Sequence, residues 1–333
     1  MVARTDWRER TTLVIGCSGF VGRALTSRLC KSGARVIALG RNTKPTGALS
    51  LDGSSCRLTY VCGDISDRGV IQKVLEEFGI DTVFHLAAQS KVEIARQNPA
   101  ETFEVNIKGT WNVLDAVRMT GRNINVLLAS SDMVYGESAA TPSTEIAPTR
   151  GRSPYAASKL CAELLADCYH QSFSVPVCIA RTTNLYGGGD LNFERIVPST
   201  IRAVMRGEAP LINSSGLPER DYLYIEDAIA GYLLLAEAMD DRAIRGETFN
   251  FSSGKAISVS TVVETILRLM QRTDLQPLIL GRHSGEISIR HSSSAKAQEM
   301  LGWQPQTSLE TGLKKTIEWY EAHAKEACVE AQN

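Results

Sequence analysis

The stretch that most restricts the fold of this chain lies near its N-terminus. The apolar segment Thr11–Ile15 predicts a short buried strand, and it leads directly into Gly16-Cys17-Ser18-Gly19-Phe20-Val21-Gly22. Residues 23–30 then have helical spacing, and Arg35–Leu39 predicts a second strand. In a strand–turn–helix unit of this kind, the glycines let the backbone approach a pyrophosphate at the N-terminus of the helix. We therefore expect a dinucleotide to bind at residues 16–22.

The rest of the chain repeats this alternation of strands and helices. Further strand signals lie at Leu58–Cys62, Thr82–Ala88, Asn125–Ala129 and Val175–Ala180. The alternation predicts an α/β fold, a doubly wound parallel Rossmann sheet with helices on both faces. We assign residues 11–186 to this dinucleotide-binding domain, with residues 225–252 returning to it. Residues 187–224 and 253–320 are expected to form a smaller, discontinuous α/β substrate-binding region.

The residues that follow the second and third strands bear on the choice of cofactor. An acidic residue after the second strand would bind the adenosine ribose hydroxyls, but the sequence reads Gly40-Arg41-Asn42. The Arg41 guanidinium can pair with a 2′-phosphate, so we expect NADP, with NAD as second choice. Alternatively, Arg41 stacks on adenine or points to solvent. Asp64 follows the third strand, where it can flank the adenine ring.

A second local pattern supplies candidate chemistry. Ser153-Pro154 is typical of a helix start, because serine caps free amides and proline suits the first helical position. Tyr155 and Lys159 then share one face of that helix. A neighbouring ammonium favours the phenolate and lowers the pKa of a tyrosine. Tyr155 is therefore a candidate to exchange a proton with a sugar or alcohol hydroxyl, although the same spacing also occurs in surface pairs.

Composition limits the partners and the location of the protein. The net charge of −1 gives no electrostatic argument for nucleic acid or a membrane surface. No apolar run approaches the roughly 20 residues of a membrane span, and the polar first ten residues lack a signal core. The eight cysteines are scattered without metal-site spacing. We expect no metal, and reduced cysteines in a cytoplasmic protein.

Several motifs fall in an order that is typical of one family. They are Gly16-x-x-Gly19-x-x-Gly22, Asp64, His85-Leu86-Ala87-Ala88, Asn106-x-x-Gly109-Thr110, Ser130-Ser131, Tyr155-x-x-x-Lys159 and Arg220-Asp221-x-x-Tyr224. Over residues 11–320 the chain resembles the nucleotide-sugar epimerase/dehydratase branch of the extended short-chain dehydrogenase/reductases. Residues 187–190, 195–198 and 201–202 look closest to those of CDP-glucose 4,6-dehydratases.

The resemblance implies a role for each matching position. The resemblance implies cofactor contacts at Gly16, Gly19, Phe20, Val21, Gly22, Asp64, Ile65, Leu86, Ala87, Ala88, Asn106, Tyr155, Lys159 and Thr182. Arg41, from the argument above, joins this set. The nucleotide-diphosphate sugar would contact Ser90, Ser131, Asn184, Val197, Arg220, Arg282 and Glu286. Ser131 would bind the sugar O4, Tyr155 would take its proton, and Lys159 would bind the nicotinamide ribose and lower the tyrosine pKa. The resemblance also implies a homodimer that packs residues 105–117 and 155–169.

The residue after Asp132 departs from the dehydratase pattern. In sugar 4,6-dehydratases the two positions after Ser131 are typically Asp-Glu, Ser-Glu or Asp-Lys; the acid protonates the departing O6 and the next residue removes the C5 proton. Here Asp132 can serve as the acid, but Met133 follows it, and a thioether cannot be a proton base. We place an NDP-hexose 4,6-dehydratase-like enzyme first, with Tyr155, a water or a second-region residue as base. An NDP-sugar 4-epimerase or 4-ketoreductase is the alternative, and a non-catalytic NAD(P)-binding protein is a third.

Overall fold

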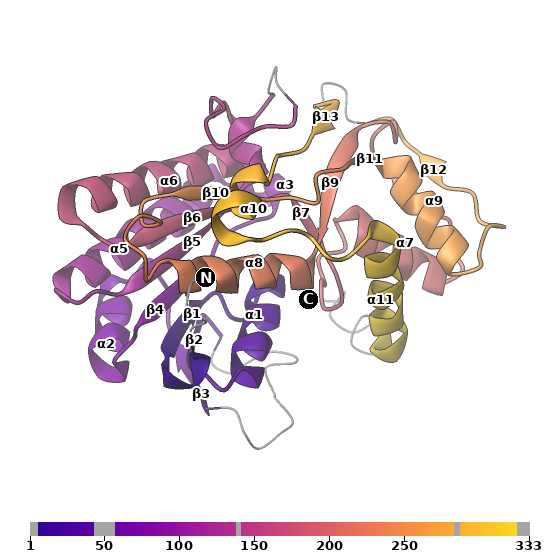
Figure 1. Cartoon of the computed structure of the whole chain (residues 1–333). Coiled ribbons are helices and arrows are strands. Elements are labelled where there is room, and N and C mark those ends of the chain that lie inside the picture. Colours follow the sequence, from indigo (N-terminus) through magenta and orange to yellow (C-terminus); the bar gives the residue numbers. More distant parts are fainter. Residues whose placement is uncertain (1–5, 43–56, 138–140, 283–286, 325–333) are drawn as a thin grey trace.

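The N-terminal strand–turn–helix unit forms the centre of a parallel sheet in the computed structural model (Figure 1), which describes residues 6–42, 57–137, 141–282 and 287–324. Seven strands pair in the order β3-β2-β1-β4-β5-β6-β10, all parallel. They are β1 (Thr11–Ile15), β2 (Arg35–Gly40), β3 (Arg57–Cys62), β4 (Thr82–His85), β5 (Asn125–Ser131), β6 (Val177–Thr182) and β10 (Thr248–Phe251). The order reverses direction between β1 and β4, and ligands of such sheets bind at that point, beyond the carboxyl ends of the strands.

Helices cover both faces of this sheet, which confirms the predicted α/β class. One face carries α1 (Phe20–Lys31) and α8 (Ile225–Ala238); the other carries α2 (Arg68–Phe78), α5 (Gly109–Met119) and α6 (Pro154–Phe173). Val14 packs on the face covered by α1 and α8, whereas its neighbours Leu13 and Ile15 pack on the face covered by α2, α5 and α6. Successive strand side chains point to opposite faces, so a strand covered on both sides is apolar throughout.

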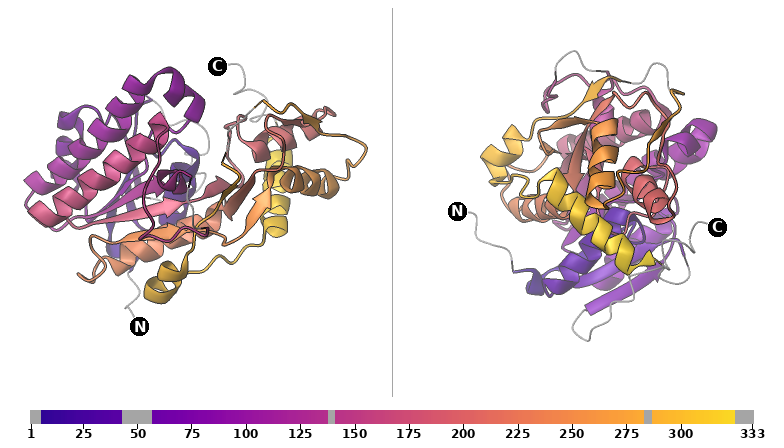
Figure 2. Two further views of the ribbon diagram at one scale, coloured as in Figure 1. Left: turned by 90° about the horizontal axis from the view of Figure 1, so that it is seen from above. Right: turned by 90° about the vertical axis from the view of Figure 1, so that its right-hand side faces the viewer.

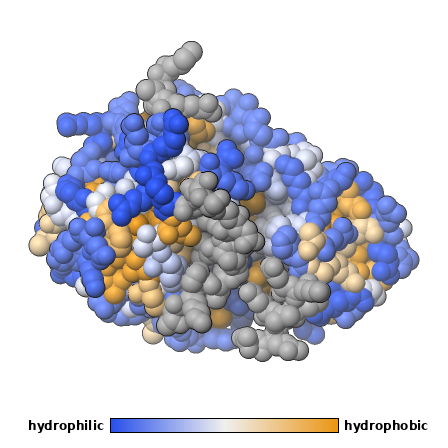
Figure 3. Space-filling model, turned by 90° about the horizontal axis from the view of Figure 1, so that it is seen from below, coloured by the Kyte–Doolittle hydropathy of each residue, from blue (hydrophilic) through white to orange (hydrophobic). Residues whose placement is uncertain are grey.

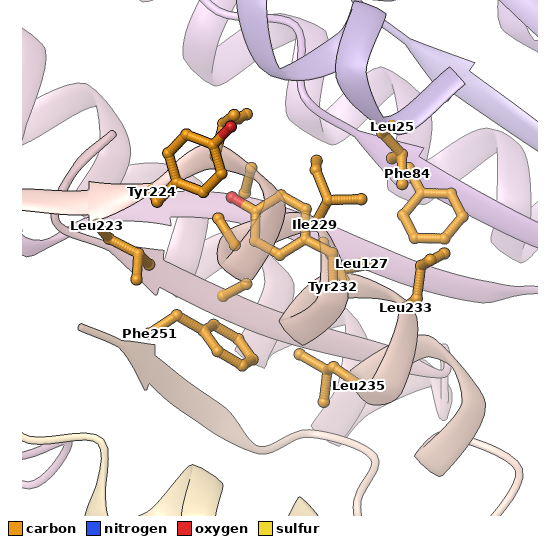
Figure 4. Close-up of a cluster of buried hydrophobic side chains, with 14 of the residues drawn as sticks. Leu25, Phe84, Leu127, Leu223, Tyr224, Ile229, Tyr232, Leu233, Leu235 and Phe251 are labelled. Carbon is orange, nitrogen blue, oxygen red and sulfur yellow. The ribbon is translucent and has the colours of Figure 1, made fainter. Parts of the chain in front are cut away.

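Helix α8 brings the chain back to the sheet after an excursion. Its residues Ile229, Tyr232 and Leu233 pack into the same buried cluster as Phe84 of β4 and Leu127 of β5 (Figure 4). All five side chains are buried, and burying one large apolar side chain stabilises a fold by about 1.5–3 kcal/mol. The next strand, β10, then completes the sheet beside β6.

A second group of elements lies to one side of the sheet (Figures 1 and 2). Its small sheet contains β7 (Asn184–Tyr186), β9 (Glu219–Tyr224), β11 (Ala256–Ser258) and β13 (Ile289–Arg290). A two-stranded sheet pairs β8 (Leu211–Ile212) with β12 (Leu278–Ile279). Helices α7 (Ile196–Met205), α9 (Val259–Leu269) and α11 (Leu309–Ala322) pack together beside them.

Short elements complete the chain and correct one expectation. They are η1 (Trp7–Glu9), α3 (Val92–Gln97), α4 (Pro99–Phe103), η3 (Glu104–Lys108), η4 (Asp132–Tyr135) and α10 (Ala295–Leu301). The helix expected from Pro99 to Val117 is interrupted, because η3 is a π-helical turn between α4 and α5. Such turns widen the helix locally and re-aim the side chains that they carry, here including Asn106.

The cysteines and the surface complete the description of the fold. Cys17, Cys62, Cys161, Cys168 and Cys178 are free. Cys30 is disulfide-bonded, so the expectation of reduced cysteines is wrong for this residue. The face in Figure 3 is mostly hydrophilic with several hydrophobic patches. Within the part of the chain that the structure describes, every helix is too short or too polar to cross a membrane.

Candidate active site

A cleft of about 1730 Å³ lies where the predicted site residues gather. Its walls come from the glycine turn, the carboxyl ends of the central strands, the start of α6, and the elements around β7, β9 and β13. A pocket for one drug-sized ligand typically measures about 300–1,000 Å³. This cleft is therefore large enough to hold two ligands side by side.

Most of the predicted site residues line this cleft. On the cofactor side they are Gly16, Gly19, Phe20, Val21, Gly22, Arg41, Asp64, Ile65, Leu86, Ala87, Ala88, Tyr155, Lys159 and Thr182. On the substrate side they are Ser90, Ser131, Asn184, Val197, Arg220 and Arg282. Asn106 and Asp132 are not among the lining residues. Glu286 lies outside the described residues.

The glycine turn offers backbone amides to the cleft. Gly19 is the N-cap of α1 and makes no side-chain cap, so the first amides of the helix are available to an anion. A Cβ atom at Gly22 would overlap the Gly16 carbonyl oxygen, whereas one at Gly19 would meet only that oxygen, at 3.4 Å. Gly22 thus keeps the turn closed, and Gly19 leaves space free above the amides. This cradle fits a dinucleotide pyrophosphate.

Two charged side chains lie at the far end of the cofactor side. Arg41 is exposed and lines the cleft beside Asp64. Burial alone would raise the pKa of Asp64, but hydrogen bonds from the Ser66 amide and hydroxyl, both at 2.8 Å, outweigh it. The charge of Arg41 lowers the pKa of Asp64 further. Asp64 is therefore a fixed anion, while the guanidinium of Arg41 remains accessible from the cleft.

The start of α6 presents the candidate catalytic pair. Ser153 accepts a hydrogen bond from the Ala156 amide at 3.3 Å and Pro154 is the first helical residue, as predicted. Lys159 is buried, and its Nζ donates to the carbonyl oxygen of Ala129 at 2.8 Å. Burial lowers the pKa of Lys159 to about 8, although the charge of Glu163 opposes this shift.

The pKa of Tyr155 moves opposite to the direction expected from the Tyr–Lys spacing. Burial raises it to about 12, and the charge of Asp132 adds to the rise. The charge of Arg195 and a hydrogen bond with Ser131 lower it, but by less. The physical reason is that desolvation of a phenolate outweighs the nearby cations. Tyr155 is therefore a protonated phenol in this structure.

Asn106 supports the cleft from behind instead of facing it. Its Oδ1 accepts from the Gln89 amide at 2.7 Å, and its Nδ2 donates to the Gln89 carbonyl at 3.1 Å and to Ser158 Oγ at 2.8 Å. These bonds tie the end of β4 to α6, so that they fix the position of the Tyr155 helix. Asn106 does not line the cleft, and the cofactor contact expected there stays a prediction.

Two arginines near Tyr155 escaped prediction as site residues. Arg195 lines the cleft and pairs with Asp190 at 3.0 Å, and its charge acts on Tyr155. Arg290 lines the cleft and pairs with Asp132 at 3.1 Å. Arg195 stands in a segment that the family resemblance marked, so position alone could have found it. No local pattern marks Arg290, because its partner lies far away in the sequence.

Arg220 is held by the backbone at the edge of the substrate side. Its Nη1 donates to the carbonyl oxygens of Glu219 at 2.7 Å and Ile287 at 2.8 Å. The adjacent Asp221 is occupied elsewhere, since it accepts from Thr183 and from the hydroxyls of Ser252 and Ser253. Arg220 is thus fixed in the cleft wall, in a position suited to recognise phosphate.

Comparison with known proteins agrees with this geometry. The family model described as GDP-mannose 4,6 dehydratase matches residues 13–316. The chain is 30% identical to the dTDP-glucose 4,6-dehydratase of Haemophilus influenzae over 337 residues, which cover 92% of this chain and 97% of that protein. It is 29% identical to a trifunctional UDP-glucose 4,6-dehydratase/UDP-4-keto-6-deoxy-D-glucose 3,5-epimerase/UDP-4-keto-L-rhamnose-reductase of Arabidopsis thaliana, over 95% of this chain. The chain spans only 47% of that longer relative.

Solved structures give the same result. The UDP-glucose 4-epimerase of Thermotoga maritima, solved with UDP-glucose, superposes with a TM-score of 0.86 at 26% identity and covers 94% of this chain and 99% of that one. The dTDP-glucose 4,6-dehydratase DesIV of Streptomyces venezuelae, solved with NAD bound, superposes with a TM-score of 0.84 at 26% identity, covering 95% and 98%. The resemblance to the nucleotide-sugar epimerase/dehydratase branch is therefore confirmed.

Proposed function

The chain belongs to the GDP-mannose 4,6-dehydratase family, and from this premise we propose that it modifies a nucleotide-diphosphate hexose by oxidising the sugar at C4. One observation carries the proposal: Ser131, Tyr155 and Lys159 meet in the same cleft as the glycine turn. Bound there, a nicotinamide cofactor would supply the hydride acceptor. The cleft is large enough for both that cofactor and a nucleotide sugar.

In this proposal, each residue of the cleft has a separate role in binding or oxidising the sugar. Ser131 and Tyr155 both line the cleft and would receive the C4 hydroxyl, and Tyr155, once ionised to the phenolate, would accept its proton as C4 is oxidised. Lys159 is buried beside them, and its charge would stabilise the phenolate once formed. Arg195 adds a second cation. Arg220 and Asn184 line the substrate side, where they would hold the nucleotide diphosphate.

Two onward courses are open to the resulting 4-keto sugar. Relatives such as the dTDP-glucose 4,6-dehydratase of Haemophilus influenzae favour a 4,6-dehydratase-like loss of water. Met133 favours the second candidate, a 4-epimerase or 4-ketoreductase, because it occupies the position of the C5 base in the dehydratase pattern and lines the cleft.

The experiment that tests the proposal is incubation with CDP-, GDP-, UDP- and dTDP-hexoses, followed by mass spectrometry and sugar analysis. Loss of one water supports the dehydratase-like course. Unchanged mass with a new C4 stereoisomer supports the second candidate. Failure to convert any nucleotide hexose, with cofactor binding intact, would favour a non-catalytic NAD(P)-binding protein.

For the cofactor, we propose NADP over NAD. The support is the exposed Arg41 at the adenosine end of the cleft, where a 2′-phosphate would sit. Titration of the protein with each cofactor tests this choice. We expect Arg41→Ala to weaken NADP(H) binding by about tenfold, which corresponds to about 1.4 kcal/mol, and to change NAD(H) binding little. Tighter binding of NAD(H) by the wild type would reverse the assignment.

We also propose a cytoplasmic homodimer that packs α5 and α6 against their symmetry mates. Four large apolar side chains on these helices are exposed: Trp111 by 42%, Met119 by 56%, Leu164 by 62% and Phe173 by 52%. Light scattering in solution tests the assembly, and Trp111→Glu should shift it to monomers. Residues 11–186 with 225–252 would form the cofactor-binding part, and residues 187–224 and 253–320 the substrate-binding part.

A further inference from the structure

Asp132 lies behind the wall of the cleft. Its neighbours Ser131 and Met133 line the cleft, whereas the Asp132 side chain is only 3% exposed. Each of its carboxylate oxygens accepts a hydrogen bond: Oδ1 from Ser131 Oγ at 3.3 Å and Oδ2 from Arg290 Nε at 3.1 Å. An ionised carboxylate accepts hydrogen bonds and donates none. Asp132 is therefore used as an acceptor in this arrangement.

Arg290 reaches Asp132 from a distant part of the chain. It lies on β13, in register with Arg220 of β9, and its side chain is 15% exposed. Its Nη2 also donates to Asn184 Oδ1 at 3.2 Å. One guanidinium thus joins η4, which follows β5, to the substrate-facing β7. Arginine stays charged at all ordinary pH values, and removing one partner of a buried ion pair is costly, so the contact is persistent.

Loss of water from the 4-keto sugar makes definite demands on the site. The C5–H and C6–O6 bonds break and a C5=C6 double bond forms. A base must take the C5 proton, and an acid must give a proton to O6, which leaves as water; the sugar as a whole is neither oxidised nor reduced in this step. Met133 cannot be the base. Asp132, the residue at the position of the acid, is turned toward Arg290.

We propose that Arg290 selects the course of the reaction by holding Asp132 as a hydrogen-bond acceptor and so withholding the proton that O6 requires. The inference rests on the proposed oxidation at C4. The 4-keto sugar then keeps its O6, and the two electrons removed at C4 return to C4, on the same face or the opposite one. Arg290 is a positioning residue in this scheme, because it acts through Asp132.

The test first introduces a base at position 133 and then removes the Arg290 guanidinium that holds Asp132. Met133→Glu recreates the Asp-Glu pair of the dehydratase pattern, and we expect it to lose little water while Arg290 is present. Adding Arg290→Gln should raise the fraction of product that lacks one water by at least about tenfold. This increase is smaller than the full rate enhancement that a positioned general acid gives, about 10²–10⁴-fold. Adding Arg290→Lys should leave that fraction low, since the ammonium keeps the charge. Mass spectrometry of the products measures the fraction.

Three results separate the possible failures. Equal water loss in Met133→Glu and Met133→Glu/Arg290→Gln, including none in either, overturns the role of Arg290. Water loss by the wild type that Asp132→Asn abolishes would show that Asp132 donates despite its partner, which also overturns it. If the wild type forms no 4-keto sugar, 4-epimer or reduced cofactor from any nucleotide hexose, the proposed function itself fails.

A control and a measurement without turnover complete the design. Arg272→Gln removes a guanidinium from the same part of the chain, where it pairs with the exposed Asp274, and should leave the product fraction unchanged. In thermal melting, Arg290→Gln leaves Asp132 buried without its partner, so the double variant Asp132→Asn/Arg290→Gln should melt higher than Arg290→Gln alone. Purely additive losses would mean that the pair is not coupled in the folded protein.

Discussion

The two sides of the cleft are built in different ways. The cofactor side consists of the glycine turn and small residues such as Ala87 and Ala88, which follow directly on strands of one sheet. The substrate side consists of long side chains, among them Arg195, Arg220 and Arg290, from segments far apart in the sequence. A surface made of backbone recognises any dinucleotide, whereas a surface made of charged side chains depends on each of them. We therefore expect the fold to set the cofactor class, and a few side chains to set the substrate and the course of the reaction.

The largest expected effect lies where the two sides meet. Tyr155→Phe removes the proton acceptor for the sugar hydroxyl, so we expect kcat to fall by about 10²–10⁴-fold with unchanged cofactor binding. Tyr169→Phe, on the same helix but outside the lining of the cleft, is the matched control and should retain full activity. Equal activities of the two variants would remove Tyr155 from the chemistry.

The next effect compares a buried ion pair of the sheet with an exposed one beside the substrate elements. Arg181 holds Glu163 through two hydrogen bonds of 2.9 and 2.6 Å, and both side chains are at most 8% exposed. Arg181→Met should cost about 3–5 kcal/mol in the free energy of unfolding, because Glu163 is left buried and unpaired. Arg268→Met, whose partner Glu310 is exposed, should cost at most about 1 kcal/mol. Chemical denaturation measures both, and similar costs would contradict the distinction.

A pH effect should mark the buried lysine of the cofactor side. The pKa of Lys159 falls from 10.5 to about 8 on folding, so between those values the unfolded chain binds more protons than the folded one. The free energy of unfolding of the cofactor-free protein should then rise with pH in this window, by up to about 2 kcal/mol between pH 8 and pH 9.5. Lys159→Met should lack this rise. Parallel pH curves for the two proteins would show that Lys159 is not desolvated.

The last pair of variants separates the two glycines of the turn. Gly22→Ala should lower the free energy of unfolding by about 1–3 kcal/mol, because the new methyl group overlaps backbone of the turn. Gly19→Ala should leave stability within about 0.5 kcal/mol, since its methyl group meets only the Gly16 oxygen. It should instead weaken cofactor binding by about tenfold. Melting and cofactor titration distinguish the outcomes, and a stability loss at Gly19 would contradict the assignment of that space to the cofactor.

The difference between the two sides also explains what could be predicted from the sequence. The unit from Thr11 to Leu39 is a run of consecutive residues, and so is the start of α6. Local sequence patterns therefore predicted both, together with the parallel sheet that the alternation of strands and helices implies. The Asp132–Arg290 contact joins residues 158 positions apart through the two-residue strand β13, which has no periodicity to detect. Such contacts depend on tertiary packing alone.

One expectation is wrong and another is left untested, because burial and helix geometry are not visible in a motif. The Tyr–Lys spacing predicted a lowered pKa for Tyr155, but desolvation raises it. The motif also placed Asn106 toward the cofactor, but the π-helical turn aims it at Gln89 and Ser158. In both cases the residue type was informative and its surroundings decided what it does.

The pairing of β10 with β6 has a consequence for how such proteins diversify. The chain leaves the sheet after β6 and returns to it through α8 and β10, so residues 183–224 behave like an oversized loop between two elements of the main body. Material can be exchanged or enlarged inside a closed excursion of this type without disturbing the layers beneath it. We therefore expect residues 183–224 to tolerate change better than the sheet does, and structures that share this architecture do carry names as different as epimerase and dehydratase.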